Sequence, residues 1–271
     1  MNRGIKELLS GMTLEEKVGQ LLHIGIGLGH LESDTGWPTA EMRTAITDLK
    51  PGAVRVYGTH DHGPYFMAEY TNTLQEWAAE GEMGVPLLIS CDCEYGTTDV
   101  VRHGVEGYPA LLGRTATGST DLAESVAAAI ARDMQSLGLN MVHQPDVDVN
   151  TNPNNPVIGV RAAGYDAEDV IEYAKAQLRG VQAEEQVTVA KHFPGHGDTT
   201  QDSHHDLPVV TYGREELEEV HLKPFETAID AGVDAIMTSH IVVECLDDER
   251  PATLSREVIA GLLREEIGFE G

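Results

Sequence analysis

Short apolar runs alternate along the chain with longer amphipathic stretches. The runs are rich in β-branched residues, and several are apolar almost throughout, which is typical of strands buried on both faces of a parallel sheet. They predict strands over residues 21–27, 52–58, 85–92, 139–149, 187–193 and 235–243. The stretches between them predict helices over residues 40–49, 64–80, 119–138, 166–182, 213–232 and 254–268. This repeated alternation predicts an α/β fold.

Polar side chains gather where the predicted strands end. They are Asp92 and Glu94, Asp146 and Asp148, His192 with the loop that follows it, and His240. In a (β/α)8 barrel the carboxyl ends of the strands carry the catalytic residues, so the pattern favours chemistry at this edge. A dinucleotide-binding fold is a weaker interpretation, because the glycines of GIGLGH (25–30) precede a loop-like stretch and not a helix.

The composition adds a large surplus of negative charge. Of the 271 residues, 45 are Asp or Glu and 18 are Lys or Arg, which gives a formal net charge of −27. The hydrophobic fraction of 41% is too high for a disordered acidic chain. One interpretation is a moderately acidic cytosolic enzyme; the one we favour is adaptation to a high-salt cytoplasm, where salt screens the self-repulsion. The same charge predicts no binding to nucleic acid or to a membrane.

The length and the absence of internal linkers or repeats predict one domain over residues 1–271. The N-terminus lacks the apolar core of a classical signal, and no later run reaches the roughly 18 apolar residues of a spanning helix. We therefore expect a cytoplasmic protein. Its three cysteines form no disulfide framework, and Cys91 and Cys93 alternate along one predicted strand, where buried small side chains are expected.

The stretch KHFPGHGDTTQDSHHDLP, residues 191–208, concentrates His and Asp directly after a predicted strand. Its potential metal ligands are His196, Asp198, Asp202, His204, His205 and Asp206. However, the spacings H-x-H and H-E-x-x-H are absent from the stretch, so we expect no metal.

The triplet DSH offers a different chemistry in the same loop. Asp202 stands two residues before His204, close enough for its carboxylate to hold one ring nitrogen and leave the other to exchange a proton. Taken alone, the triplet is a weak signal and more often marks a surface turn that the Asp braces. Gly195 and Gly197 allow the backbone to turn sharply, which is compatible with both interpretations.

The whole string AKHFPGHGDTTQDSHHDLP resembles the signature of family 3 glycoside hydrolases, in their β-N-acetylhexosaminidase branch. Further stretches similar to that family are MTLEEKVGQLL (12–22), LISCDCEYG (88–96), DVNTNPNNPVIGVRAAG (148–164) and residues 236–271. The resemblance therefore extends over almost the entire chain. It implies a (β/α)8 barrel of the TIM type, with about six of the eight strand–helix units present.

The resemblance also implies roles for single residues. His204 would be the general acid/base, and Asp202 would orient it and adjust its proton affinity. Lys191 and His192 would hydrogen-bond the sugar. Lys191 has some support of its own, because a lysine directly after a buried strand is poorly explained as a solubilising charge.

Other implied substrate ligands follow the third strand and the fourth. Asp92 would bind sugar hydroxyls and Arg161 would shape the pocket around them. Family members usually carry Glu-Gly-Gly and then an Arg, whereas this chain reads EYGTTDVVR. Tyr95 replaces a Gly and Arg102 stands further along, so the implied role of Arg102 is the least direct of these.

The implied reaction is hydrolysis of a terminal β-linked N-acetylglucosamine with retention, through a covalent intermediate. The resemblance implies no cofactor. A family 3 phosphorylase or a β-glucosidase is an alternative, since a neutral His base repels an anionic phosphate less than a carboxylate would. In the family, the nucleophile is an Asp at the end of the seventh strand.

The sequence ends at Gly271, before the implied seventh strand. We expect a fragment of a longer enzyme, and we expect the 271-residue chain by itself not to turn over aryl N-acetyl-β-glucosaminides. Two alternatives stay open. One is half of a split enzyme that a second, C-terminal polypeptide completes; the other is a non-catalytic sugar-binding protein.

The charge surplus predicts a salt-dependent stability. We expect the melting temperature to rise markedly between about 0.1 M and several molar KCl, because the added ions screen repulsion among exposed carboxylates. Melting followed by circular dichroism measures it. Sucrose is the control, since it favours the compact state without screening charge. Equal stability at both KCl concentrations would exclude the adaptation.

Overall fold

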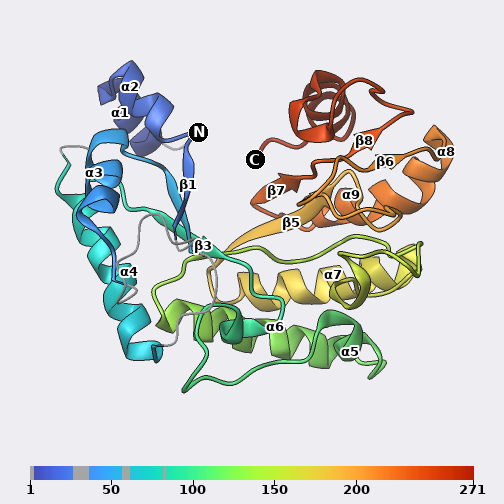
Figure 1. Cartoon of the computed structure of the whole chain (residues 1–271), viewed down its shortest axis with the longest axis horizontal. Helices are drawn as coiled ribbons and strands as arrows, with labels where there is room; N and C mark the ends of the chain where they lie inside the picture. Colours follow the sequence, from blue (N-terminus) through green and yellow to red (C-terminus); the bar gives the residue numbers. More distant parts are fainter. Residues whose placement is uncertain (1–2, 27–36, 57–61, 82–83) are drawn as a thin grey trace. The chain divides into compact units, whose positions relative to one another are not determined.

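The computed structural model describes residues 3–26, 37–56, 62–81 and 84–271. Helices and strands alternate along them (Figure 1), which confirms the α/β class. The strands are β1 (His23–Ile26), β2 (Ala53–Val56), β3 (Leu88–Cys91), β4 (Met141–Val142), β5 (Val187–Phe193), β6 (Val209–Val210), β7 (Ala235–Thr238) and β8 (Val242–Val243).

The helices are of three kinds. The α-helices are α1 (Arg3–Gly11), α2 (Leu14–Gly19), α3 (Ala40–Leu49), α4 (Pro64–Ala79), α5 (Leu111–Thr115), α6 (Thr120–Ser136), α7 (Ala167–Gln182), α8 (Arg214–Glu216) and α9 (Lys223–Asp230). The 3-10 turns are η1 (Gly96–Asp99), η2 (Gly159–Arg161) and η4 (Ala252–Leu254), and the π-helical segments are η3 (Leu217–Leu222) and η5 (Glu257–Glu266).

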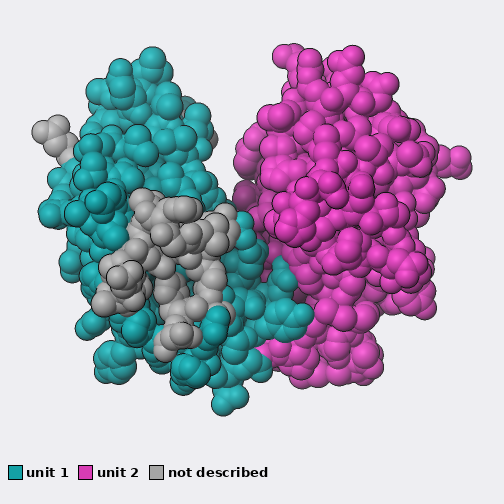
Figure 2. All heavy atoms as spheres, in the orientation of Figure 1, with its two compact units in different colours: residues 1–107, 133–141 teal, residues 108–132, 142–271 magenta. Residues whose placement is uncertain are grey.

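The chain forms two compact units, coloured separately in Figure 2. Unit 1 comprises residues 1–107 and 133–141, and unit 2 comprises residues 108–132 and 142–271. The expectation of one domain over the whole chain stays a prediction.

Unit 1 is a parallel sheet with helices. Its strands β1, β2 and β3 pair in sequence order, with Ala53 opposite His23 on one side and Leu88 on the other. Thr39 caps α3 by accepting a hydrogen bond from the N–H of Met42. The helices α3 and α4 pack together through fully buried side chains, namely Met42, Ile46, Met67, Tyr70 and Leu74.

Unit 2 holds the larger apolar core and the histidine-rich loop. In it β5 pairs with β7, and β6 pairs with β8, both in parallel. Helices α7 and α9 contact each other, and Phe193 at the end of β5 meets Phe225 of α9 edge to face, with ring centroids 5.2 Å apart. The carboxyl end of β5 is thus held in place by packing against the apolar core of unit 2.

Each predicted strand has an observed counterpart, but two predictions were too long. Within 139–149, regular pairing is confined to β4, because Pro145 lacks an N–H and cannot donate to a ladder. Its neighbours still lie against β5: the N–H of Val189 donates to Gln144 O, and the N–H of Val147 donates to Lys191 O, at 3.0 and 2.9 Å.

The prediction of one strand over 235–243 was wrong in a similar way. The N–H of Ser239 donates to Phe193 O, and the N–H of Val242 then donates to Pro208 O. The chain therefore changes partner after β7 and pairs as β8 with β6, a short sheet that the sequence pattern did not predict.

The predicted helix 213–232 is also interrupted. Pro224 has no N–H for the preceding turn, and the segment before it widens into η3 between α8 and α9. Predicted residues 27, 57 and 58 of the first two strands, and residues 27–30 of GIGLGH, lie outside the described residues.

Two smaller expectations can be compared with the structure. Cys91 and Cys93 are fully buried, as expected, and burial raises the pKa of the Cys91 thiol well above its usual value. Among the described helices, none has both the length and the apolar character that crossing a membrane requires.

Candidate active site

A buried carboxylate, Asp148, organises the polar residues at the end of β5. Its side chain is 0% exposed. Oδ2 accepts hydrogen bonds from His192 Nδ1 at 2.7 Å and from the His192 N–H at 3.3 Å, and Oδ1 accepts one from the His196 N–H at 2.6 Å. Burial alone would raise the pKa of Asp148, but its contacts with His192, whose ring gains a proton only below about pH 4, and with His196 hold it well below its usual range.

The hydrogen bonds of His192 fix its protonation state. Nδ1 faces a carboxylate and must donate, whereas Nε2 lies 3.2 Å from Nη2 of Arg161, a group that can only donate. Nε2 therefore carries the lone pair, and the ring is neutral. Burial acts in the same direction and lowers the pKa of His192 to about 4, although Asp148 opposes the shift.

Lys191 and Arg161 flank this histidine. Lys191 lies within β5 and is 1% exposed, so it is no solubilising surface charge. Arg161 ends η2, where Nη1 donates to Val157 O at 3.0 Å while Nη2 reaches His192. The structure thus brings Lys191, His192 and Arg161, all candidates from the sequence, into one cluster around Asp148.

Two glycines let the loop after β5 approach its surroundings closely. A Cβ on Gly197 would stand 1.8 Å from Val149 O, which no side chain tolerates. Gly195 has a φ of 132°, and a Cβ there would stand 2.9 Å from Cβ of His221. Both glycines therefore serve packing in this structure.

Asp202 and His204 form a local pair further along the same loop. Asp202 Oδ1 accepts hydrogen bonds from the N–H of His204 at 2.9 Å and from its Nδ1 at 2.7 Å. These bonds, the backbone bond first, lower the pKa of Asp202. The His204 side chain is 73% exposed, so Nε2 is directed away from its carboxylate partner and is open to solvent.

Two further sequence candidates belong to unit 1. Asp92 follows β3 and forms an ion pair with Arg55 of β2, a residue that sequence reasoning did not single out. Arg102 is exposed in the segment after η1. The structure describes these residues within unit 1 and the other candidates within unit 2.

One group of the described residues has the geometry to hold a cation. Asp146, Asp148 and His192 each place a ligand atom within 4.8 Å of the others. However, His192 Nδ1 donates a hydrogen bond to Asp148 Oδ2, so a metal ion that bound both atoms would have to replace that hydrogen bond. The arrangement as it stands is a hydrogen-bonded pair, and the expectation of no metal stays a prediction.

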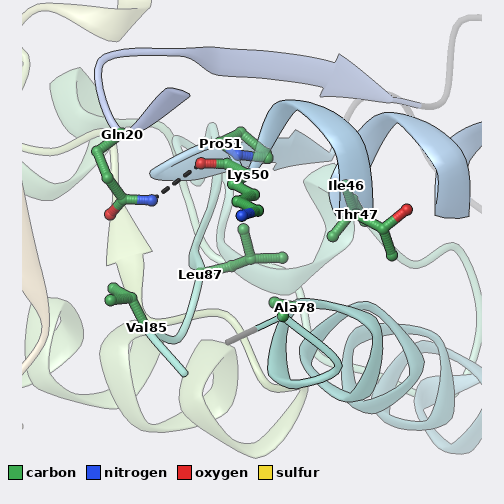
Figure 3. Close-up of a pocket in the computed structure, with 9 residues that line it drawn as sticks. Gln20, Ile46, Thr47, Lys50, Pro51, Ala78, Val85 and Leu87 are labelled. Carbon is green, nitrogen blue, oxygen red and sulfur yellow. Dashed lines mark hydrogen bonds between the residues drawn. The ribbon is translucent and has the colours of Figure 1, made fainter. Parts of the chain in front are cut away.

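Figure 3 shows a pocket in unit 1 at the amino ends of β1, β2 and β3. Its lining residues Gln20, Pro51 and Leu87 come just before β1, β2 and β3. Gln20 Nε2 donates to Lys50 O at 2.9 Å across one side of it. Because barrel enzymes carry their chemistry at the carboxyl ends of the strands, we assign this pocket no part in a reaction.

The residues that sequence reasoning missed are the supports of the site. The sequence pattern marks Asp148 only as an acidic residue at a strand end. The segment after it holds the loop by side-chain bonds, with Thr151 Oγ1 to Asp198 Oδ1, Asn152 Nδ2 to Thr199 O and Asn155 Nδ2 to His196 O at 2.8–3.0 Å. The signal was present, since polar residues that follow adjacent parallel strands meet at one edge.

Comparison with solved structures identifies the type of fold. A glycoside hydrolase family 3 beta-N-acetylglucosaminidase from Paenibacillus sp. str. FPU-7 matches with a TM-score of 0.87 and 40% sequence identity, over 96% of this chain and 48% of that one. This match confirms the (β/α)8 TIM-barrel type.

Sequence comparison gives the family. The glycosyl hydrolase family 3 N terminal domain matches residues 13–271. Beta-hexosaminidase A of Pseudoalteromonas piscicida is 35% identical over 96% of this chain and 48% of its own length, and the Beta-hexosaminidase of Tolumonas auensis is 32% identical over 86% and 68%. The chain belongs to glycosyl hydrolase family 3. It spans about half the length of the Pseudoalteromonas and Paenibacillus relatives.

The neutral state of His192 predicts a pH-dependent stability. Its pKa is about 4 in the folded protein and about 6.5 in an unfolded chain, so the unfolded state binds the extra proton between these values. The free energy of unfolding should therefore fall as the pH is lowered from about 6.5 to about 4, by up to about 3 kcal/mol from this residue. Urea titrations across this pH range measure it.

The variant His192→Asn removes the titrating ring and should flatten this dependence. His221, whose pKa burial also lowers, contributes with the same sign and is present in both proteins. The matched control is His205→Asn, which replaces an exposed histidine of the same loop. Identical pH slopes for the parent protein and His192→Asn would contradict the neutral, buried assignment.

Proposed function

We propose that this chain provides the acid/base group and part of the sugar site of a retaining glycoside hydrolase that acts on terminal β-linked N-acetylglucosamine. The family membership and the two relatives named as beta-hexosaminidases support the reaction class. The Paenibacillus relative supports the sugar, since it is named as a beta-N-acetylglucosaminidase.

The observation that carries the proposal is the 2.7 Å contact between Asp202 Oδ1 and His204 Nδ1. A carboxylate on Nδ1 fixes the tautomer and leaves Nε2 as the atom that gives or takes a proton. His204 Nε2–H would protonate the glycosidic oxygen as the bond to the leaving group breaks. The neutral ring would then take a proton from the incoming water.

The cluster around Asp148 supplies suitable ligands for the sugar. Lys191 is a buried lysine whose side-chain nitrogen can donate hydrogen bonds, and Arg161 presents further donors beside His192. In the proposed site, these two residues and His192 bind hydroxyl groups of the N-acetylglucosamine ring. Asp92 and Arg102, both in unit 1, stay candidate sugar ligands by the family resemblance alone, and that of Arg102 is the less direct.

Sugar binding can be tested on the chain itself. We expect calorimetry to detect N-acetylglucosamine binding that weakens roughly 10- to 100-fold in Lys191→Met, because a charged hydrogen-bond donor is lost while the buried side-chain length is kept. Lys175→Met is the matched control, since Lys175 is an exposed lysine of α7 in the same unit. Equal affinity in both variants, with circular dichroism showing that both are folded, would remove Lys191 from the site.

The acid/base role can be tested on a form of the protein that turns over aryl N-acetyl-β-glucosaminides. His204→Ala should reduce kcat/KM for phenyl N-acetyl-β-glucosaminide by about 100-fold or more, and for the dinitrophenyl analogue by far less, because a good leaving group departs without protonation. His205→Ala, the adjacent exposed histidine, is the control. Equal losses on the two substrates would exclude His204 as the acid. Unchanged turnover on both substrates would show that the reaction uses a different acid/base group.

A further inference from the structure

The imidazole of His196 is bonded at both nitrogens to hydroxyl groups of its own loop. His196 is 2% exposed. Its Nδ1 lies 2.8 Å from Oγ1 of Thr199, and its Nε2 lies 2.8 Å from Oγ of Ser203. Neither His196 nor Ser203 has a role in the reaction described above, although Ser203 stands between the two members of the Asp202–His204 pair.

The directions of these bonds follow from the neighbouring groups. The Thr199 hydroxyl donates to the carbonyl oxygen of His196 at 3.0 Å, so its oxygen is left to accept the proton on Nδ1. In the neutral ring Nε2 then carries the lone pair. Ser203 is consequently the donor, and its O–H points at a fixed acceptor inside unit 2.

His196 is itself held in place by the cluster around Asp148. Its N–H donates to Asp148 Oδ1 at 2.6 Å, and its carbonyl accepts from Asn155 Nδ2 at 2.8 Å. Its ring also meets that of His192 edge on, with centroids 5.8 Å apart. The acceptor that Ser203 reaches is therefore fixed relative to the proposed sugar ligands.

The other hydrogen bonds of residues 202–206 lie within this turn. The Asp202 carboxylate binds His204, and the Asp202 carbonyl accepts the N–H groups of His205 and Asp206, each at 3.0 Å. Within the described part of the chain, the bond from Ser203 to His196 is the hydrogen bond that connects residues 200–207 with the body of unit 2.

We infer that the hydrogen bond from Ser203 to His196 positions the Asp202–His204 turn, with Ser203 and His196 acting as positioning residues. The inference deepens the proposed function and rests on it for its kinetic consequence. A turn with strong internal bonds moves as one piece, so a single external bond adjacent to both residues sets where the ring of His204 stands. Small displacements of an acid/base group reduce turnover by up to about 100-fold.

The first test measures order in the 271-residue chain and needs no activity. Ser203→Ala removes the donor at a half-buried position, and Ser203→Thr restores a hydroxyl. NMR relaxation should show backbone order parameters of residues 202–206 near 0.85 in the parent protein, below about 0.6 in Ser203→Ala, and recovered in Ser203→Thr. Gln201→Ala, an exposed neighbour, should leave them unchanged. Equal order parameters in the parent protein and Ser203→Ala would overturn the inference.

The second test uses the same catalytically active form as the test of His204, and it separates positioning from a merely structural role. Ser203→Ala should lower kcat for the phenyl glycoside about 10- to 100-fold and change KM by no more than about two-fold. The loss of kcat should be smaller for the dinitrophenyl glycoside. In Ser203→Thr, kcat should recover. A fall in melting temperature with equal kinetic losses on both substrates would overturn the positioning role. If His204→Ala shows no dependence on the leaving group, the proposed function fails, while the order parameters still decide whether the bond positions the turn.

Discussion

The burial of the Asp148 carboxylate is the constraint on which this site depends. An ionised group at 0% exposure is costly unless hydrogen bonds replace its hydration. Here the replacement comes from the N–H and Nδ1 of His192 and from the N–H of His196. Because these donors lie at the end of β5 and in the loop after it, satisfying one charge fixes the strand end and the start of the loop together.

The same carboxylate determines what its neighbours can do chemically. By holding the proton on Nδ1 it leaves His192 Nε2 as an acceptor, which is the state that the Arg161 guanidinium requires. His192 is therefore unsuited to donate a proton from Nε2. His204 is paired with a carboxylate and its side chain is exposed, and we propose it for the proton transfer for this physical reason as well as by family resemblance.

The sequence predicted the elements better than their contacts. The strand over residues 187–193 could be predicted because both faces of a parallel sheet are buried. The apolar run in the sequence therefore has the same bounds as the strand. The approach of Asp202 to His204 was also predictable, since two residues of one turn cannot lie far apart. The breaks at Pro145 and after Thr238 depend on which neighbour each segment pairs with, and that is decided by tertiary structure.

The partner atoms of the residues that support the site could not be predicted from the sequence, for a related reason. Asp148 meets its histidines across 44 and 48 residues of chain, and a Cβ on Gly197 would collide with Val149 O from a different segment. A sequence shows that a glycine or an aspartate is present, but the atom it faces follows only from the folded arrangement. The role of His196 could not be predicted from its own flanking residues either, because the direction of its bond to Ser203 depends on the Thr199 hydroxyl.

Most acidic residues of the described chain are exposed to solvent, whereas the carboxylate at the centre of the site is buried. Of the 45 acidic residues, those that are buried among the described residues are Asp146 and Asp148. Mobile ions screen exposed carboxylates strongly and buried pairs much less. Concentrated salt would therefore reduce repulsion over the surface while the bonds of His192 and His196 to Asp148 keep their strength. Substitutions that change the number of exposed charges can therefore adapt such a protein to its solvent. They leave the electrostatics of the residues that we propose to bind sugar nearly unchanged.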